Sequence, residues 1–356
     1  MTALKYIIKF LGIALIVYVF AMVCMVPLGP GLNSISKIEN HDTHTELEIN
    51  GFATNFNKSP NSIRAFLVSS DSVITQECFD VNVIDNNNIK LKVTLPDTAN
   101  SNSWIVRVNS IDNGWLVMNP EFIKLPKHKG VSTNTGIATE DLDPKSIHAK
   151  TENFHFPFLP RIIESIRNLP LHVPMWFTMF VLMAIAFVAS IKVLNLNKID
   201  TRQDLIAKSA TKVGLLFGFL GLITGSLWAR GAWLSWWVWE DPQLNGALVT
   251  VFVYLGYIIL RKSSDNESST PRIAAVYTIF AFIILFILLM IMPRFTESLH
   301  PGKSGNPAFS KYDLTNSLRT VFYPSVIGWI IIGLWMYRIT LRYEIIKEKV
   351  QRKLEH

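Results

Sequence analysis

The sequence is poor in charged residues and in cysteine. Asp, Glu, Lys and Arg together make up 17% of the 356 residues, whereas hydrophobic residues make up 49%. So little charge is unusual for a water-soluble protein and indicates several membrane spans. The two cysteines, Cys24 and Cys78, fall in an apolar segment and in a polar region. We therefore expect neither a disulfide between them nor a cysteine-based metal site.

Six apolar segments approach or reach the roughly 20 residues that a helix needs to cross a bilayer. The third and fourth are short, and both adjoin one aromatic segment, so that segment would set their ends. The sequence therefore predicts an α-helical polytopic membrane protein with six transmembrane helices. The segments are Ile7–Val26, Pro174–Val193, Val213–Trp228, Leu244–Leu260, Ile273–Met292 and Val321–Ile339.

Lysine and arginine gather at four places on one side of the predicted spans. They lie before the first span, between the second and third, between the fourth and fifth, and after the sixth. Basic loops tend to stay in the cytoplasm, so we expect both termini there. These loops also account for most of the net charge of +7, so the charge does not indicate a nucleic-acid partner. A cleaved signal peptide is the alternative for the first span, because a basic start and an apolar stretch precede Pro27 and Gly29.

Between the first two spans lies a polar region with the alternating pattern of β-strands. The alternation is clearest over Thr45–Asn50, Ile89–Leu95 and Trp104–Asn109, and Asn113-Gly114 is a typical hairpin turn. About seven short strands in about 90 residues predict an inserted extracytoplasmic all-β domain of the immunoglobulin-like type, with a small barrel as the alternative.

The next segments predict a connection back to the membrane. Gly130–His155 is polar and aperiodic, as in a linker, and Phe156–Leu171 has the mixed pattern of an amphipathic helix at the interface. The expected order is a first transmembrane helix (1–27), a β-sandwich (28–129), a linker with interfacial helix (130–171), a five-helix domain (172–341) and a cytoplasmic tail (342–356).

Half of the ten tryptophans fall within twelve residues at the end of the third span. A membrane-interface belt needs only one or two rings per helix end, so the cluster favours a flat apolar ligand, with a belt as the alternative. Asp241-Pro242 follows the cluster, and we interpret it as a helix N-cap and first residue in preference to a catalytic role. The clustered residues are Trp228, Trp233, Trp236, Trp237 and Trp239.

Two histidines lie on the same predicted side of the membrane as the tryptophans. His172 is at the start of the second span and His300 is in the loop after the fifth. A lone loop histidine is more often solvated than a ligand. A pair of imidazoles, however, is a common axial ligand set for haem iron beside aromatic rings. The other histidines have no partner at metal-ligand spacing, and we interpret them as surface residues: His41, His44, His128, His148, His155 and His356.

These motifs resemble those of a known family. Gly225-Ser-Leu-Trp with Trp236-Trp-Val-Trp-Glu-Asp resembles the WWD haem-handling proteins, and Leu171-His-Val-Pro with Leu299-His-Pro resembles their CcmC branch. The resemblance covers about Pro160 to the C-terminus. It implies a haem carrier of cytochrome c-type biogenesis in the bacterial inner membrane, without catalytic residues, that binds haem b at the outer face.

The same resemblance implies residue roles and partners. His172 and His300 would be axial ligands of the haem iron, the tryptophan segment its platform, and Arg167 a partner of a propionate. Haem would pass to a periplasmic haem chaperone, assisted by ABC transporter subunits and a small membrane subunit. The family usually has Trp-Asp-Ala-Arg-Leu where this chain has Trp239-Glu-Asp-Pro-Gln243, so Arg230, Arg294 or Lys303 would replace the missing arginine.

Three other functions are considered. A synthase that attaches haem to apocytochrome is disfavoured because there are six predicted spans and one tryptophan motif. A b-haem oxidoreductase is disfavoured because the apolar interiors of the spans contain no histidine. A polar-solute transporter is disfavoured because Val213–Trp228 and Ile273–Met292 contain no charged residue. The resemblance assigns no role to the β domain.

Overall fold

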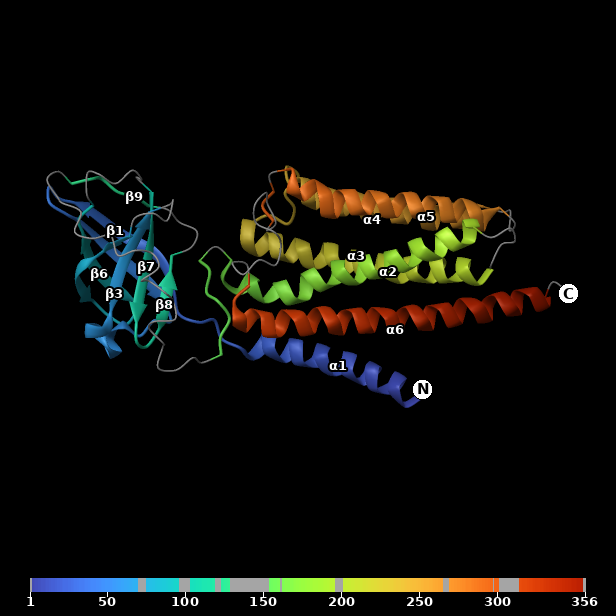
Figure 1. Ribbon diagram of the computed structural model, residues 1–356, viewed down its shortest axis with the longest axis horizontal. Helices are drawn as coiled ribbons and strands as arrows, with labels where there is room; N and C mark the ends of the chain where they lie inside the picture. Colours follow the sequence, from blue (N-terminus) through green and yellow to red (C-terminus); the bar gives the residue numbers. More distant parts are fainter. Residues whose placement is uncertain are drawn as a thin grey trace. The chain divides into compact units, whose positions relative to one another are not determined.

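The chain folds into a helical unit, Met1–Met25 with Arg167–His356, and a β unit, Val26–Ile166. Figure 1 shows both units in a computed structural model. The structure describes residues 2–69, 75–95, 103–118, 123–128, 154–160, 162–195, 201–264, 269–296, 298–300 and 314–354.

The β unit is a sandwich of two antiparallel sheets. One sheet has the order β1-β2-β6-β5, and the other has the order β4-β3-β7-β8, with β9 also paired to β7. This is the immunoglobulin-type arrangement with one strand added beside the third, so the predicted fold is confirmed. The strands are β1 (Gly31–Asn40), β2 (Thr45–Phe52), β3 (Arg64–Ser69), β4 (Thr75–Glu77), β5 (Phe79–Val83), β6 (Asn88–Val93), β7 (Ser103–Ser110), β8 (Gly114–Val117) and β9 (Ile123–Lys124).

Alternating side chains from the two sheets form one core. Leu47 on β2 and Leu91 on β6 meet Trp104 and Val106 on β7, and all four are almost fully buried. The predicted Asn113-Gly114 turn is confirmed, because Gly114 joins β7 to β8 with a φ of 67°. Glycine adopts that left-handed conformation without strain, which explains the residue at this turn.

Histidines of the β unit are better connected than expected. The interpretation of His128 as a surface residue is wrong: it is 3% exposed, and the backbone N–H of Leu95 donates to its Nδ1 at 3.2 Å. The expected lack of partners is also wrong for His41 and His44, whose ring nitrogens lie within 4.8 Å of each other and of a Glu46 oxygen.

The segment predicted as an interfacial helix has another structure. Phe156 pairs with Leu28 in a short parallel bridge, and the Phe158 ring stacks on Phe52 with centroids 4.3 Å apart. A short 3-10 turn, η3 (Ile163–Asn168), then leads into the second helix. The prediction of one helix over Phe156–Leu171 is therefore wrong for its first part, because Phe156 and Phe158 pack in the β unit and helical turns begin only at Ile163. Most of the predicted linker lies outside the described residues.

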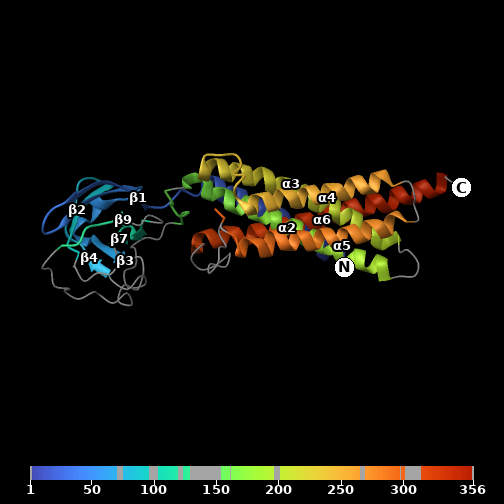
Figure 2. The same cartoon turned by 90° about the horizontal axis from the view of Figure 1, so that it is seen from above.

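Six helices of the described part of the chain are long and apolar enough to cross a membrane, so the six predicted spans are confirmed. The protein is a multi-pass membrane protein, and Figure 2 shows its helices running side by side in the helical unit. The fifth helix continues through a π-turn, η4 (Ile287–Ile291), and a 3-10 turn, η5 (Met292–Arg294). The helices are α1 (Thr2–Met25), α2 (Leu169–Asn195), α3 (Thr201–Trp233), α4 (Pro242–Ser263), α5 (Thr270–Phe286) and α6 (Asn316–Leu354).

A row of glycines on α3 receives large side chains from α2. At each of four positions an added Cβ would come within 2.7 to 2.9 Å of a side-chain atom of α2. Small residues let transmembrane helices approach closely, so this row explains the tight packing of the two helices. The pairs are Gly214 with Met183, Gly218 with Met179, Gly221 with Trp176 and Gly225 with His172.

Buried charges near the beginning of α3 are paired. Asp204 accepts two hydrogen bonds of 2.6 Å from the Arg261 guanidinium of α4. Glu344 of α6, whose side chain is 3% exposed, lies 2.8 Å from the Lys208 ammonium and 2.5 Å from that of Lys212. Paired in this way, these charges hold α3 against α4 and α6 instead of marking a polar path through the bundle.

Candidate functional site

The predicted site residues gather where α2 and α4 begin and α3 ends, at one end of the helical unit in Figure 1. His172 is in the first turn of α2, and His300 follows η5. Trp228 and Trp233 are on the last turns of α3, and the other three tryptophans lie in the loop before α4. Among these five, Trp236 and Trp239 are 57% and 68% exposed, and the rest are half-buried.

His300 lies between an aromatic ring and a carboxylate. Its imidazole meets the Trp233 indole edge to face, with centroids 5.3 Å apart. In a second contact, Nδ1 of His300 lies 3.7 Å from Oδ1 of Asp241. The sequence predicted that His300 and the tryptophan segment share one face, and the structure brings His300 to Trp233.

Asp241 connects the start of α4 to the loop that carries His300. Oδ1 accepts from the backbone N–H groups of Gln243 and Leu244 at 2.9 and 3.0 Å, which confirms the predicted N-cap. Oδ2 accepts from the Ser298 hydroxyl at 2.8 Å and from the Leu299 N–H at 2.7 Å. The carboxylate therefore fixes the backbone on both sides of its contact with His300.

The surroundings keep Asp241 ionised. Burial of the side chain opposes ionisation, but the His300 imidazole and the donors at Leu299, Leu244 and Ser298 hold the pKa of Asp241 below its usual range. A charged acceptor strengthens each of these hydrogen bonds. The sequence suggested the cap but contained no sign of the second half of this network, because Ser298 is 57 residues away.

His172 is held by a threonine of α3. Its Nδ1 lies 3.0 Å from Oγ1 of Thr224, and that hydroxyl donates to the Leu220 carbonyl at 2.7 Å. A hydroxyl has one proton, so Thr224 acts as the acceptor toward the imidazole. The Nδ1 of neutral His172 therefore carries the ring proton, and Nε2 keeps its lone pair.

Sequence reasoning assigned no individual role to three residues that shape this position. Thr224 orients the ring of His172. Gly225 leaves room for the ring, since an added Cβ would lie 2.8 Å from its Cε1. Trp176, one turn further along α2, meets His172 at 6.5 Å between ring centroids. His172 thus contacts Trp176 rather than the five clustered tryptophans, and it is close enough to His300 for an electrostatic interaction.

The tryptophan loop is held by its own hydrogen bonds. Ser226 of α3 donates to the Trp236 carbonyl at 2.9 Å, and the indole N–H of Trp237 donates to Oδ1 of Asn245 at 3.3 Å. The rings of Trp237 and Trp239 are 6.1 Å apart. The loop is therefore fixed to both α3 and α4, and it presents exposed indole faces without a rearrangement.

The arrangement fits a large, flat, metal-containing ligand. It offers two imidazoles with an oxygen 3.0 and 3.7 Å from Nδ1, and one of them, His300, contacts the clustered indoles. Residues 160–356 match the family described as "Heme exporter protein C". The chain belongs to the heme exporter protein C family.

Curated relatives have the same description. The protein of Bradyrhizobium diazoefficiens is 29% identical over 52% of this chain and 69% of its own length. The protein of Escherichia coli K12 is 26% identical over 50% of this chain and 70% of its own. The Haemophilus influenzae protein is 28% identical over 39% of this chain, and the match spans only 56% of that relative.

The family match begins at residue 160 and therefore leaves out the β sandwich. It includes all ten predicted site residues, from Arg167 to His300. The family resemblance thus concerns the helical unit, and the β unit is an addition whose role the match does not address.

The basic residues considered for this site have different surroundings. Nη1 of Arg167 donates to the Val23 carbonyl of α1 at 2.8 Å. Arg230 lies 6.0 Å from the centre of the Trp236 ring and donates to the Leu234 carbonyl. Arg294 is exposed on η5. Lys303 lies outside the described residues.

Proposed function

We propose that this protein binds haem at the outer face of the inner membrane and hands it to a periplasmic haem chaperone during cytochrome c maturation. The observation that carries the proposal is the contact of His300 with both Trp233 and Asp241, in the same helical unit as the oriented imidazole of His172. Membership of the heme exporter protein C family supports the same function.

His172 and His300 are the proposed axial ligands of the haem iron. Oγ1 of Thr224 lies 3.0 Å from Nδ1 of His172, and Oδ1 of Asp241 lies 3.7 Å from Nδ1 of His300, so Nε2 of each ring is the proposed donor to iron. Partners of this kind fix the tautomer and orientation of histidine ligands. The two partners differ, since one is a hydroxyl at hydrogen-bond distance and the other is an ionised carboxylate at 3.7 Å.

The indoles and arginines are the proposed contacts of the porphyrin. Trp228, Trp233, Trp236, Trp237 and Trp239 form a surface on which its flat apolar face stacks. Arg230, beside Trp236, and the exposed Arg294 are suited to the two propionates. The Val23 carbonyl already uses one donor of Arg167, so that residue also ties α1 to the site.

The proposed activity is carriage of haem, with no covalent bond made or broken by the protein's own side chains. The cargo is b-type haem, because thioether attachment is left to later proteins. A synthase that attaches haem to apocytochrome is the second candidate. The exposed indoles favour a carrier, because bound haem would stay accessible to a receiving protein.

The proposed orientation and partners follow from the basic loops and the family. Both termini lie in the cytoplasm, and the β unit lies in the periplasm. ABC transporter subunits and a small membrane subunit accompany the protein, and the haem chaperone receives the cargo.

The test is haem retention by the protein purified in detergent from a haem-replete host. The absorption spectrum should show substoichiometric six-coordinate b-type haem. Joint replacement of Trp236 and Trp237 by Ala should lower occupancy, because each ring contact contributes on the order of 1 kcal/mol. Leu227→Ala, on an exposed site of α3, is the control. Unchanged haem occupancy in the double variant would mean that the tryptophan cluster is an interfacial belt and does not bind haem.

A further inference from the structure

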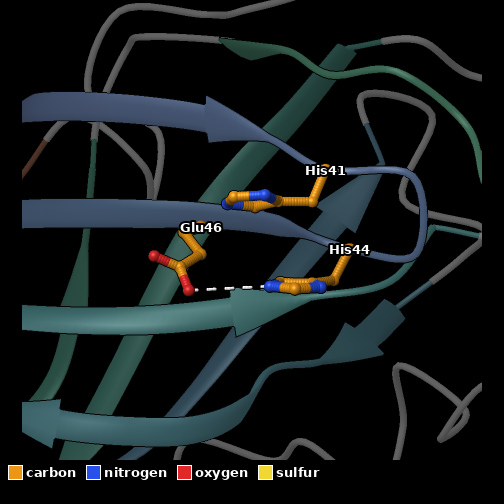
Figure 3. Close-up of side chains that lie close together, drawn as sticks. All are labelled: His41, His44 and Glu46. Carbon is orange, nitrogen blue, oxygen red and sulfur yellow. Dashed lines mark ion pairs between the residues drawn. The ribbon is translucent and has the colours of Figure 1, made fainter.

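The turn between β1 and β2 brings three potential metal ligands together in the β unit. His41 and His44 lie on the turn, and Glu46 is the second residue of β2 (Figure 3). One nitrogen of each ring and one carboxylate oxygen all lie within 4.8 Å of one another. The segment is a short His-x-x-His-x-Glu sequence, far along the chain from the helical site.

The backbone that carries these ligands is well defined. The N–H of His41 donates to the His44 carbonyl at 2.9 Å, and the Thr45 hydroxyl donates to Oδ1 of Asn40 at 3.0 Å. These bonds close the turn at the end of the β1–β2 ladder. The two imidazoles are stacked, with centroids 4.8 Å apart and ring planes 21° apart. The turn therefore places both rings on one side of the hairpin.

His44 is oriented toward the carboxylate. Nδ1 of His44 lies 3.0 Å from Oγ1 of Thr43, and Nε2 lies 3.6 Å from Oε1 of Glu46, the contact drawn in Figure 3. Two ligands of one tetrahedral Zn²⁺, each at about 2.1 Å from the ion, are about 3.4 Å apart. The separation of Nε2 and Oε1 is close to that value.

Two lysines pair with Glu46, one at each carboxylate oxygen. Lys90 pairs with Oε2 at 2.5 Å. Lys92 lies 3.4 Å from Oε1 but only 2.8 Å from Oδ2 of Asp80, which remains its partner when Oε1 is taken. The hydrogen bond from Lys90 lowers the pKa of Glu46 to about 2.

We propose that His41, His44 and Glu46 bind one divalent transition-metal cation, with water completing its coordination. Two imidazole nitrogens and one carboxylate oxygen suit Zn²⁺ or Cu²⁺ rather than the all-oxygen preference of Ca²⁺ and Mg²⁺. Because the ligand atoms lie up to 4.8 Å apart, the exposed His41 side chain would rotate toward the bound ion. The site goes beyond haem handling and is independent of it.

The test is metal titration of the full-length protein in detergent, with His172 and His300 replaced by Ala so that the helical site does not contribute. Zn²⁺ is the probe, measured by calorimetry. This parent should bind one more Zn²⁺ than the same protein with His41→Ala and His44→Ala. Glu46→Gln should weaken the binding about 10-fold or more. Glu48→Gln, two residues along the same strand, should bind as the parent does.

A second measurement needs no variant. Zn²⁺ should protect His41 and His44, but not His155, from modification by diethyl pyrocarbonate, as mapped by peptide mass spectrometry. Ca²⁺ should give no protection, because it prefers oxygen ligands. Equal modification of His41 and His44 with and without Zn²⁺ would overturn the proposal, as would equal Zn²⁺ stoichiometry in the parent and the double-histidine variant.

Discussion

At the scale of single residues, the two proposed ligands depend on partners that touch no cargo. Thr224 is the clearest, since its hydroxyl proton is used by the Leu220 carbonyl and its lone pairs face His172. We expect Thr224→Val, which keeps the shape but removes the acceptor, to lower haem affinity about 10-fold. Thr224→Ser should retain affinity. Haem titration of the apoprotein measures both, and equal affinities of the Val and Ser variants would contradict the role of the hydroxyl.

Substitutions of Asp241 can separate its two roles, the N-cap of α4 and the contact with the His300 loop. Asn is as good an N-cap as Asp, so Asp241→Asn should leave α4 intact. While its amide oxygen caps α4, however, its NH2 group takes the place of Oδ2 and cannot accept from Ser298 or Leu299, so the His300 loop should loosen and haem affinity should fall about 10-fold. Asp241→Ala should in addition cost about 1 kcal/mol in the free energy of unfolding. If Asp241→Asn bound haem like the wild type, Asp241 would be a cap alone.

The charge of Asp241 also predicts how the stability of the protein depends on pH. Its folded-state pKa is lowered, so the stability that it contributes is present above the pKa of an unfolded aspartate, about 4, and is lost as pH falls through the folded value. The difference in apparent melting temperature between wild type and Asp241→Asn should therefore be constant from pH 8 to about pH 5 and shrink in stronger acid. A difference that grows on acidification would contradict this sign.

At the scale of helices, the glycine row of α3 positions α2 and with it His172. Gly225→Ala would place a methyl group 2.8 Å from Cε1 of the ring, so the imidazole must move away from Thr224. We expect a weakened His172 ligand, seen as a change toward five-coordinate haem in the absorption spectrum. Leu227→Ala, half a turn away and exposed, should leave the spectrum unchanged. An unaltered spectrum of the Gly225→Ala variant would contradict this, because α2 and α3 would then accommodate the added methyl group without moving the His172 ligand.

The local sequence pattern predicted the helices, strands and turns well, but it predicted the contacts between them poorly. The six spans, the alternating strands, the Gly114 turn and the Asp241 cap each depend on neighbours in sequence, and all were predictable. The contact of His172 with Thr224 depends on residues 52 apart, which no periodicity reports. The amphipathic pattern of Phe156–Leu171 was misleading, because Phe156 and Phe158 are buried against the β unit instead of a lipid surface.

At the scale of the whole molecule, the orientation in the membrane decides where the site and the β unit lie. Two single-cysteine variants test this, one with Asn87→Cys in the β unit and one with Lys349→Cys in α6, both with Cys24 and Cys78 replaced. They should differ in labelling by a membrane-impermeant maleimide. In cells with a permeable outer membrane we expect labelling at position 87 and none at position 349 until the inner membrane is broken. The reverse pattern would place the site in the cytoplasm and contradict export.

The central claim is that His172 and His300 hold one haem between them, and the absorption spectrum of purified variants tests it most directly. The wild type should show a bis-histidine b-type spectrum, His172→Ala and His300→Ala should each change it or abolish retention, and the exposed His41→Ala should match the wild type. If both single variants kept the haem content and spectrum of the wild type, the ligand assignment would be wrong.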